Sequence, residues 1–221
     1  MNIQDESGYV VFSDGDIGSA HVMAHRLLDA GDIALGRDRL GQWLAGREGS
    51  GSDWAHIQFH MAVFELEAGD WNAAHARFLE EVLPIAAATD DALTDAPALA
   101  WRLALRAGAG RGRDLPWAPL RRTALRALER EAEPFVELHN LLALAGAGDT
   151  GSLDHWLRRR RGASASFSPV VQMGEMLRDI TLRRRRQAAD RLREVVPEIP
   201  AIGGSGAQNA LFAELGRRMA A

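Results

Sequence analysis

The chain contains no cysteine and no lysine, and it has a single tyrosine among its 221 residues. The absence of cysteine excludes disulfides, thiolate nucleophiles and zinc sites with sulfur ligands. The absence of lysine excludes Schiff-base chemistry and a lysine general base. All 26 basic residues are therefore arginine, a bias that we attribute to genomic base composition.

Other absences exclude whole classes of protein. No apolar run reaches the ~18 residues expected of a membrane span. Residues 1–18 are acidic and lack the basic start and apolar core of a signal peptide. The formal charge of −4 gives no general attraction to nucleic acids or to anionic membranes. We therefore expect a cytoplasmic protein with no nucleic-acid partner and no membrane partner.

The composition favours helices, because Ala, Leu, Glu and Arg dominate and β-branched runs are scarce. Ile57, Met61, Phe64 and Ala68 follow one helical stripe. Glycine-containing breaks separate segments that are mostly one helix long, and this pattern predicts antiparallel helix pairs joined by short loops.

An internal repeat supports this prediction. Each copy has a Gly-Asp turn, then a small or apolar residue, and a larger apolar residue four positions later. The turns are Gly31-Asp32, Gly69-Asp70 and Gly148-Asp149. This pattern resembles the second half of a tetratricopeptide repeat. Residues 172–197 are similar to a fourth copy, in which Arg183 to Arg186 replace the turn.

We therefore predict an all-α fold, a tetratricopeptide-like antiparallel helix-pair array that forms a right-handed superhelix over residues 18–221. Residues 1–17 do not fit the repeat and form a separate N-terminal arm. Tyr9 to Phe12, followed by Ser13 to Gly15, are consistent with a short strand and a turn. They are equally consistent with an arm that covers the open end of the array.

Several polar landmarks together resemble the C-terminal half of the tetratricopeptide repeat protein 38-like family, over residues 18–218. They are the Ala24-His25 region, His56 to His60, Glu67 to Trp71 leading to Val82-Leu83-Pro84, Leu93 to Asp95 leading to Trp101 to Leu103, His139 through Asp149, and Ile202 to Gln208 with Phe212. The resemblance implies the helical-repeat fold rather than a particular activity.

Two departures from the family affect the interpretation. Family members carry additional N-terminal repeats, so the first helix, near His21 to Ala30, lacks its usual neighbour here. We therefore expect a homodimer that buries this face. The family also tends to have an acidic residue where this chain has Asn209, which weakens any transferred role for the last loop.

The histidines form a pattern on the predicted helices. His21 and His25 are four residues apart, as are His56 and His60, so each pair lies on one helical face and can chelate one metal. Neither pair is a His-Glu-x-x-His motif, so a zincin protease is not indicated. Aligned on the Gly-Asp turns, His139 occupies the same repeat position as His60. The alternative is that each histidine is a hydrogen-bonded core residue.

Each of the other candidate site residues has two interpretations. Asp95 is either the N-cap of the helix that carries Trp101 and Arg102, or it points into the groove and orients a histidine or binds a metal. Arg102 either holds an anionic group or forms a structural ion pair. Ser205 and Gln208 have the spacing of a capping box, whose free N–H groups can also bind an anion.

The basic runs 158–161 and 183–186 are interpreted as solvated helix ends rather than as a phosphate-polymer site.

The sequence thus predicts a helical-repeat protein with a His-lined concave pocket that binds a small molecule or a protein partner. The alternative is a small-molecule enzyme, a metal-dependent or histidine acid–base hydrolase, lyase or isomerase. The candidate catalytic residues are His25, His60, Asp95 and His139. The candidate ligand-binding residues are His21, His56, Trp101, Arg102, Ser205 and Gln208. A divalent metal, if bound, is expected on His25, His56, His60 and His139.

Overall fold

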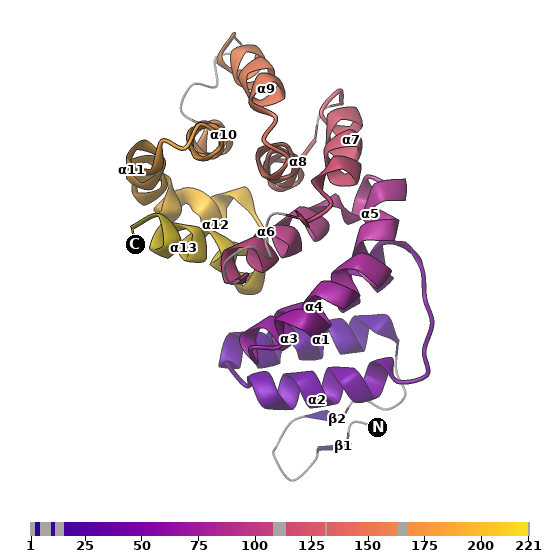
Figure 1. The fold of residues 1–221 in the computed structure, drawn as a ribbon. Coiled ribbons are helices and arrows are strands. Elements are labelled where there is room, and N and C mark those ends of the chain that lie inside the picture. Colours follow the sequence, from indigo (N-terminus) through magenta and orange to yellow (C-terminus); the bar gives the residue numbers. More distant parts are fainter. Residues whose placement is uncertain are drawn as a thin grey trace.

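The computed structural model describes residues 3–4, 10–11, 16–107, 114–130, 132–162 and 168–220 (Figure 1). The elements, in chain order, are β1 (Ile3–Gln4), β2 (Val10–Val11), α1 (Ile17–Ala30), α2 (Ile33–Leu44), α3 (Gly51–Glu67), α4 (Trp71–Arg77), η1 (Phe78–Val82), α5 (Leu83–Ala88), η2 (Asp91–Thr94), α6 (Ala96–Arg106), α7 (Trp117–Ala127), α8 (Pro134–Gly146), α9 (Thr150–Gly162), α10 (Pro169–Thr181), α11 (Arg185–Val195), η4 (Val196–Glu198), α12 (Ile199–Ile202) and α13 (Gly206–Ala220).

The predicted all-α class is confirmed for the body of the protein, where every regular element among the described residues from 16 onward is helical. The one exception in the described residues is the short antiparallel pairing of β1 with β2, in which Ile3 faces Val11 and Gln4 faces Val10. A strand at Val10 and Val11, one of the two interpretations of this segment, is therefore present. Tyr9 and residues 12–15, which complete the expected strand and turn, lie outside the described residues.

Four helix-ending turns share one geometry. In each, one residue has a positive φ, between 58° and 82°, and the next amide donates to the carbonyl five residues earlier. These bonds run from Asp32 to Leu27, from Asp70 to Glu65, from Asp149 to Leu144 and from Arg184 to Asp179, over 2.8–2.9 Å. This pattern is the Schellman motif, which normally needs glycine at the positive-φ position. The fourth turn has Arg183 there (φ 58°), as expected from the fourth copy of the sequence pattern.

The helices pack mostly on their neighbours in the chain (Figure 1). Helices α1, α2 and α3 contact one another, α6 lies between α3 and α8, and α7, α9 and α10 surround α8. The last helix departs from this order, because α13 contacts α6 and α1 as well as α11. Arg106 on α6 holds α13 in this position, since its Nε donates to Oε1 of Glu214 on α13 over 2.9 Å.

Helix α3 is shared by two hydrophobic cores. Its residues Ile57, Met61 and Phe64 pack with buried residues of α1 and α2 in the smaller core. Its residues Phe59 and Val63 belong to the larger core, which includes residues of the helices that follow. Three members of the predicted stripe are therefore buried, whereas Ala68 is the exposed C-cap residue of α3. Consequently, α3 fixes the position of α1 relative to the rest of the chain.

Candidate metal centre

The site forms where one face of α1 meets α3. Helix α1 begins at an N-cap, Asp16, whose side chain accepts a hydrogen bond from the backbone amide of Ser19 over 2.8 Å. Its Ala20 and Ala24 are buried against α2 and α3, and small residues at these positions allow a close approach of the helices. His21 and His25 follow these two alanines directly in sequence. Their side chains therefore lie at the edge of the α1–α3 interface.

Four imidazoles meet at this interface, and we call His21, His25, His56 and His60 the histidine cluster. Their ligand atoms all lie within 4.8 Å of one another. The Nε2 atom of His21 is 2.7 Å from Nε2 of His25 and 3.0 Å from Nε2 of His56. The Nε2 atoms of His56 and His60 are 3.1 Å apart. Both predicted i,i+4 pairs thus converge, and each ring contributes its Nε2 atom.

Hydrogen bonding alone explains this convergence poorly. A ring nitrogen carries either one N–H or one lone pair in the plane of the ring, so it has a single hydrogen-bonding direction. The Nε2 atoms of His21 and His56 nevertheless each face two other Nε2 atoms. Four lone pairs directed at one point are, by contrast, what a coordinated cation requires. The arrangement therefore fits a metal better than it fits a chain of hydrogen bonds.

Asp95 supports the cluster from behind. Its Oδ2 lies 2.9 Å from Nδ1 of His56, on the opposite side of that ring from the converging nitrogens. A carboxylate in this place holds the proton on Nδ1 and leaves the Nε2 lone pair free for a metal. Asp95 occupies the N-cap position of α6 but makes no side-chain capping bond there. Of the two sequence interpretations, the structure thus shows the one in which Asp95 orients a histidine.

The protonation of the cluster suits metal binding. Burial, and then the charges of neighbouring imidazoles, lower the pKa of His21 and His25. The same causes hold the pKa of His60 well below its ordinary value. Burial also lowers the pKa of His56, but the hydrogen bond and charge of Asp95 outweigh it and raise that pKa overall. Three of the four imidazoles are therefore neutral near pH 7, the form that coordinates metals.

His139 does not belong to the cluster, although the repeat alignment placed it with His60. Both side chains are fully buried, on α8 and α3 respectively. Nδ1 of His139, however, lies 2.8 Å from the backbone carbonyl oxygen of Phe135, one turn earlier in α8. The set expected to hold a metal therefore changes by one residue: His21 takes the place that the sequence gave to His139.

The remaining candidates have structural contacts. Nε1 of Trp101 donates to the carbonyl of Leu142 over 2.9 Å. Ser205 and Gln208 form a reciprocal capping box: the Ser205 amide donates to Gln208 Oε1 over 2.9 Å and the Gln208 amide donates to Ser205 Oγ over 3.2 Å. The capping interpretation is thus confirmed, and it occupies the two side chains that were also candidates for binding a ligand.

Arg102 is a buried cation beside the centre. The residue is 2% exposed, and its Nη2 donates to the carbonyl of Gln208 over 3.3 Å. Burial lowers the pKa of Arg102 to about 10, and the positive charge of this residue in turn helps to lower the pKa of His60. The neighbouring Arg106 binds Glu214 and Glu67.

Sequence reasoning missed Asn140. Its side chain is fully buried, and neither its amide nitrogen nor its amide oxygen has a hydrogen-bond partner among the described residues. Nε2 of His139 and Oδ1 of Asp95 share this property. Buried polar atoms without partners are uncommon and often mark a bound water, ion or ligand. The signal in the sequence was the polar pair His139-Asn140 directly before the apolar run from Leu141 to Ala145.

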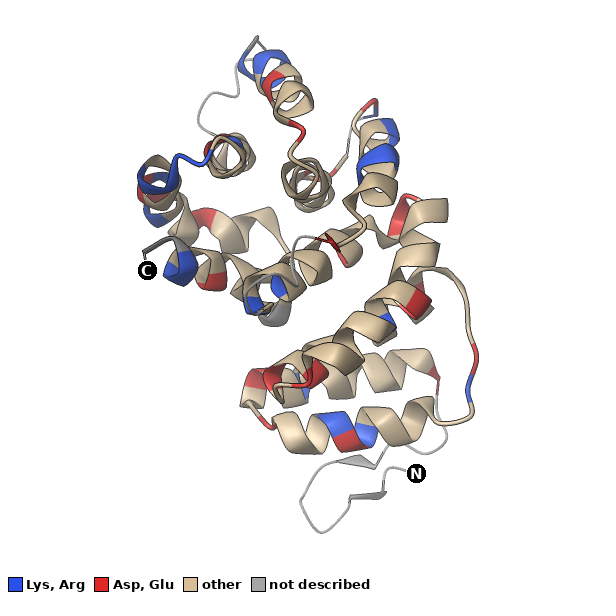
Figure 2. Ribbon diagram, in the orientation of Figure 1, with Lys and Arg blue, Asp and Glu red and all other residues tan. Residues whose placement is uncertain are grey.

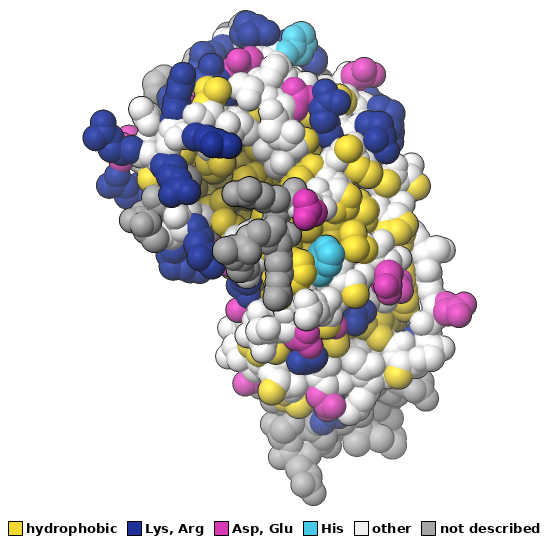
Figure 3. All heavy atoms as spheres, viewed as in Figure 1, with side chains coloured by type: hydrophobic (Ala, Val, Ile, Leu, Met, Phe, Trp, Pro, Cys, Tyr) yellow, Lys and Arg dark blue, Asp and Glu magenta, His cyan; other side chains and the backbone are white. Residues whose placement is uncertain are grey.

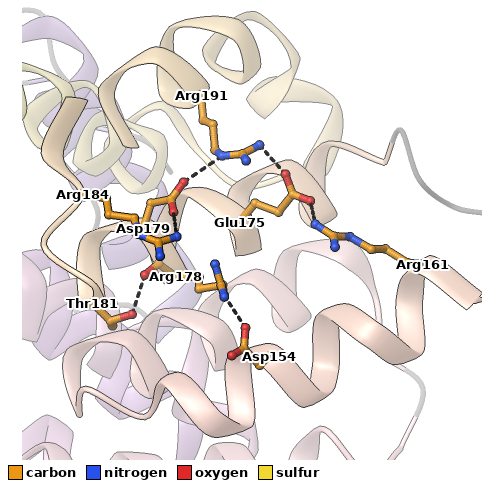
Figure 4. A network of polar contacts seen from close by, with 8 residues as sticks. All are labelled: Asp154, Arg161, Glu175, Arg178, Asp179, Thr181, Arg184 and Arg191. Carbon is orange, nitrogen blue, oxygen red and sulfur yellow. Dashed lines mark hydrogen bonds and ion pairs between the residues drawn. The ribbon is translucent and has the colours of Figure 1, made fainter. Parts of the chain in front are cut away.

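One arginine of each basic run, Arg161 and Arg184, belongs to a separate polar network on α9, α10 and the start of α11 (Figure 4). Glu175 binds both Arg161 and Arg191, and Asp179 binds Arg191 over 2.9 Å and lies 3.7 Å from Arg184. Arginines gather on these helices, at the end of the molecule away from α1 to α3 (Figure 2), and dark blue side chains cover that region of the surface (Figure 3). The carboxylates of α10 therefore neutralise part of both runs.

Within the part of the chain that the structure describes, no helix combines the length and the apolar character needed to cross a membrane. Comparison with known proteins gave no match to a family model, to a curated protein or to a solved structure. The resemblance to the tetratricopeptide repeat protein 38-like family therefore stays a prediction.

Proposed function

We propose that this protein binds one divalent transition-metal ion through the four Nε2 atoms of the histidine cluster. The observation that carries the proposal is the convergence of these atoms, with neighbouring distances of 2.7–3.1 Å. Four imidazoles bound at about 2.0–2.1 Å to one ion would hold their nitrogens about 2.9–3.4 Å apart. The cluster therefore needs only small side-chain adjustments to bind an ion.

The donor set restricts the identity of the metal. All four ligand atoms are imidazole nitrogens, which suit Zn²⁺, Cu²⁺, Ni²⁺ and Fe²⁺. Mg²⁺ and Ca²⁺ prefer oxygen ligands, and the cluster contains no carboxylate. Asp95 would act through His56, because a carboxylate hydrogen-bonded to the distal nitrogen fixes the ring and makes it a stronger ligand.

The scaffold that we propose for this centre is a tetratricopeptide-like array. The support is the repeated local geometry: four turns share the Schellman motif, including the one at Arg183. Two of them share a further contact, because Arg37 on α2 binds Asp70 over 2.7 Å and Arg121 on α7 binds Asp149 over 2.6 Å. Helices α2 to α4 and α7 to α9 are then equivalent units.

A second candidate function is the binding of a small polar molecule beside the centre. The observation that favours it is the fully buried Asn140, whose amide has no described partner. His139 and Arg102 would lie on the same buried polar layer, because the charges of Arg102 and Asp95 both influence the His139 imidazole. Such a ligand would be a small molecule that exchanges hydrogen bonds with the Asn140 amide.

Elemental analysis tests the proposal. Untagged protein dialysed against metal-free buffer and then loaded with Zn²⁺ is expected to retain one ion per chain. His25→Ala removes a half-buried ligand and should abolish stoichiometric retention. His155→Ala is the matched control, because this histidine is exposed on α9 and lies outside the cluster. Equal retention by both variants, or no retention by the unmodified protein, would refute the proposal.

A further inference from the structure

The rings of the histidine cluster are not arranged as a tetrahedron. Four of the six ring-centroid separations are nearly equal: 4.4 Å for His21–His25, 4.7 Å for His21–His56, 4.5 Å for His56–His60 and 4.4 Å for His25–His60. The other two are longer, 5.4 Å for His21–His60 and 6.2 Å for His25–His56. Four equivalent ligands around a tetrahedral ion would give six equal separations.

The nitrogen positions give the same result. Nε2 atoms around a tetrahedral ion would be about 3.3–3.4 Å apart, whereas ligands at right angles would be about 2.9 Å apart. Three of these nitrogen–nitrogen distances are 2.7, 3.0 and 3.1 Å, closer to the right-angled spacing than to the tetrahedral one. Around an ion at the centre of the cluster, His25 and His56, the most widely separated rings, would lie nearly opposite each other, with His21 and His60 between them. Ligands arranged in this way leave one side of the ion uncovered.

Among the described residues, the group of closely spaced His, Asp and Glu side chains that could hold an ion consists of the four histidines alone. Asp95 contacts the far nitrogen of His56. Water can reach the cluster: His21 and His25 are partly exposed, and the His56 side chain is 24% exposed. Only His60 is fully buried.

We infer that the metal keeps an open coordination position that holds water and exchanges it for a small anion. This inference rests on the proposed metal binding and specifies what the bound ion does. Structural zinc sites are closed by four protein ligands in a tetrahedron, whereas catalytic sites leave a position for water or substrate. Metal-bound water also loses a proton more readily than bulk water. The centre is thus built for ligand exchange rather than only for holding α1 against α3.

Cobalt(II) and azide test the inference. The full chain is loaded with Co²⁺, its visible absorption is recorded, and azide is then added in steps. Co²⁺ in a tetrahedral site absorbs far more strongly than Co²⁺ with five or six ligands, so coordination geometry can be read from the intensity. We expect weak bands that shift saturably with azide. His155→Ala is the control and should behave like the unmodified protein.

The outcomes distinguish metal binding from the open coordination position. Stoichiometric cobalt with intense bands that azide leaves unchanged would overturn the open position and leave metal binding intact. A failure of the chain to bind Co²⁺ and Zn²⁺ would refute metal binding itself. Weak bands that respond to azide in the unmodified protein, and disappear together with cobalt binding in His25→Ala, would support both.

Discussion

Asp95 offers the sharpest test of the centre, because it touches the cluster at one atom only. Its Oδ2 lies 2.9 Å from Nδ1 of His56, and its side chain is 3% exposed. Asp95→Asn keeps the shape and an acceptor oxygen but removes the charge. Hydrogen bonds to charged groups contribute about 1.5–3 kcal/mol and neutral ones about 0.5–1.5 kcal/mol. The loss of about 1.4 kcal/mol corresponds to roughly a tenfold weaker metal affinity.

Asp95→Ala removes the acceptor as well, and losing such a partner of a metal-bound histidine typically costs about 10–100-fold in affinity. We therefore expect Zn²⁺ affinity to fall from the unmodified protein to Asp95→Asn, and to fall further in Asp95→Ala. The assay is a Zn²⁺ titration in competition with a chromophoric chelator, with circular dichroism of the metal-free proteins to verify folding.

Asp53→Asn is the matched control. Asp53 is an exposed residue in the first turn of α3, and its charge also acts on His21 and His56. Asp53→Asn removes one negative charge near the cluster, as Asp95→Asn does, but it breaks no hydrogen bond to the His56 ring. If Asp53→Asn weakened Zn²⁺ binding as much as Asp95→Asn does, or if Asp95→Ala bound Zn²⁺ as tightly as the unmodified protein, the orienting role of Asp95 would be refuted.

Three further predictions follow from the described contacts. His21→Gln should lower Zn²⁺ affinity at least about tenfold in the same chelator assay, whereas His139→Gln should leave it unchanged; the opposite order would restore the set predicted from the repeat alignment. Burial lowers the pKa of His60 below its ordinary value of 6.5, so its contribution to folding is complete above that pH and is lost as the pH falls below it. Metal-free protein should therefore have a lower unfolding temperature roughly one unit below pH 6.5 than one unit above it, and an equal or higher value would contradict this expectation. Arg183→Gly should raise the free energy of unfolding by up to about 1 kcal/mol in urea denaturation, because glycine adopts the positive φ of 58° without strain; a destabilised variant would show that the arginine side chain matters more than the backbone.

Local features of the fold were readable from the sequence. Glycine followed by aspartate marked three helix ends, since glycine is the residue that tolerates the left-handed conformation there. The fourth turn could be found only by its spacing, because Arg183 carries no such signal. The long-range packing of α13 on α6 and α1 was not predictable, since neither amphipathic spacing nor turn chemistry specifies which helices meet across the chain.

The candidate site could be predicted only in part, because local spacing is visible in the sequence and long-range packing is not. The four-residue spacing placed His21 with His25 and His56 with His60, because it depends only on helix geometry. Which pairs converge depends on the packing of α1 on α3, and the repeat alignment wrongly favoured His139. The sequence allowed two roles for Asp95, the N-cap of α6 or the partner of a histidine. Only the position of His56 in the folded chain distinguishes these roles.

The return of α13 changes how the chain is expected to fold. In an open solenoid each unit touches only its neighbours, so unfolding can begin at an end and proceed stepwise. Here Arg106 and Glu214, 108 residues apart, join α6 to α13, and α13 also contacts α1. Closing so long a segment has an entropic cost that is recovered only when both ends are in place. The first and last helices are thus expected to unfold together, in a single cooperative transition.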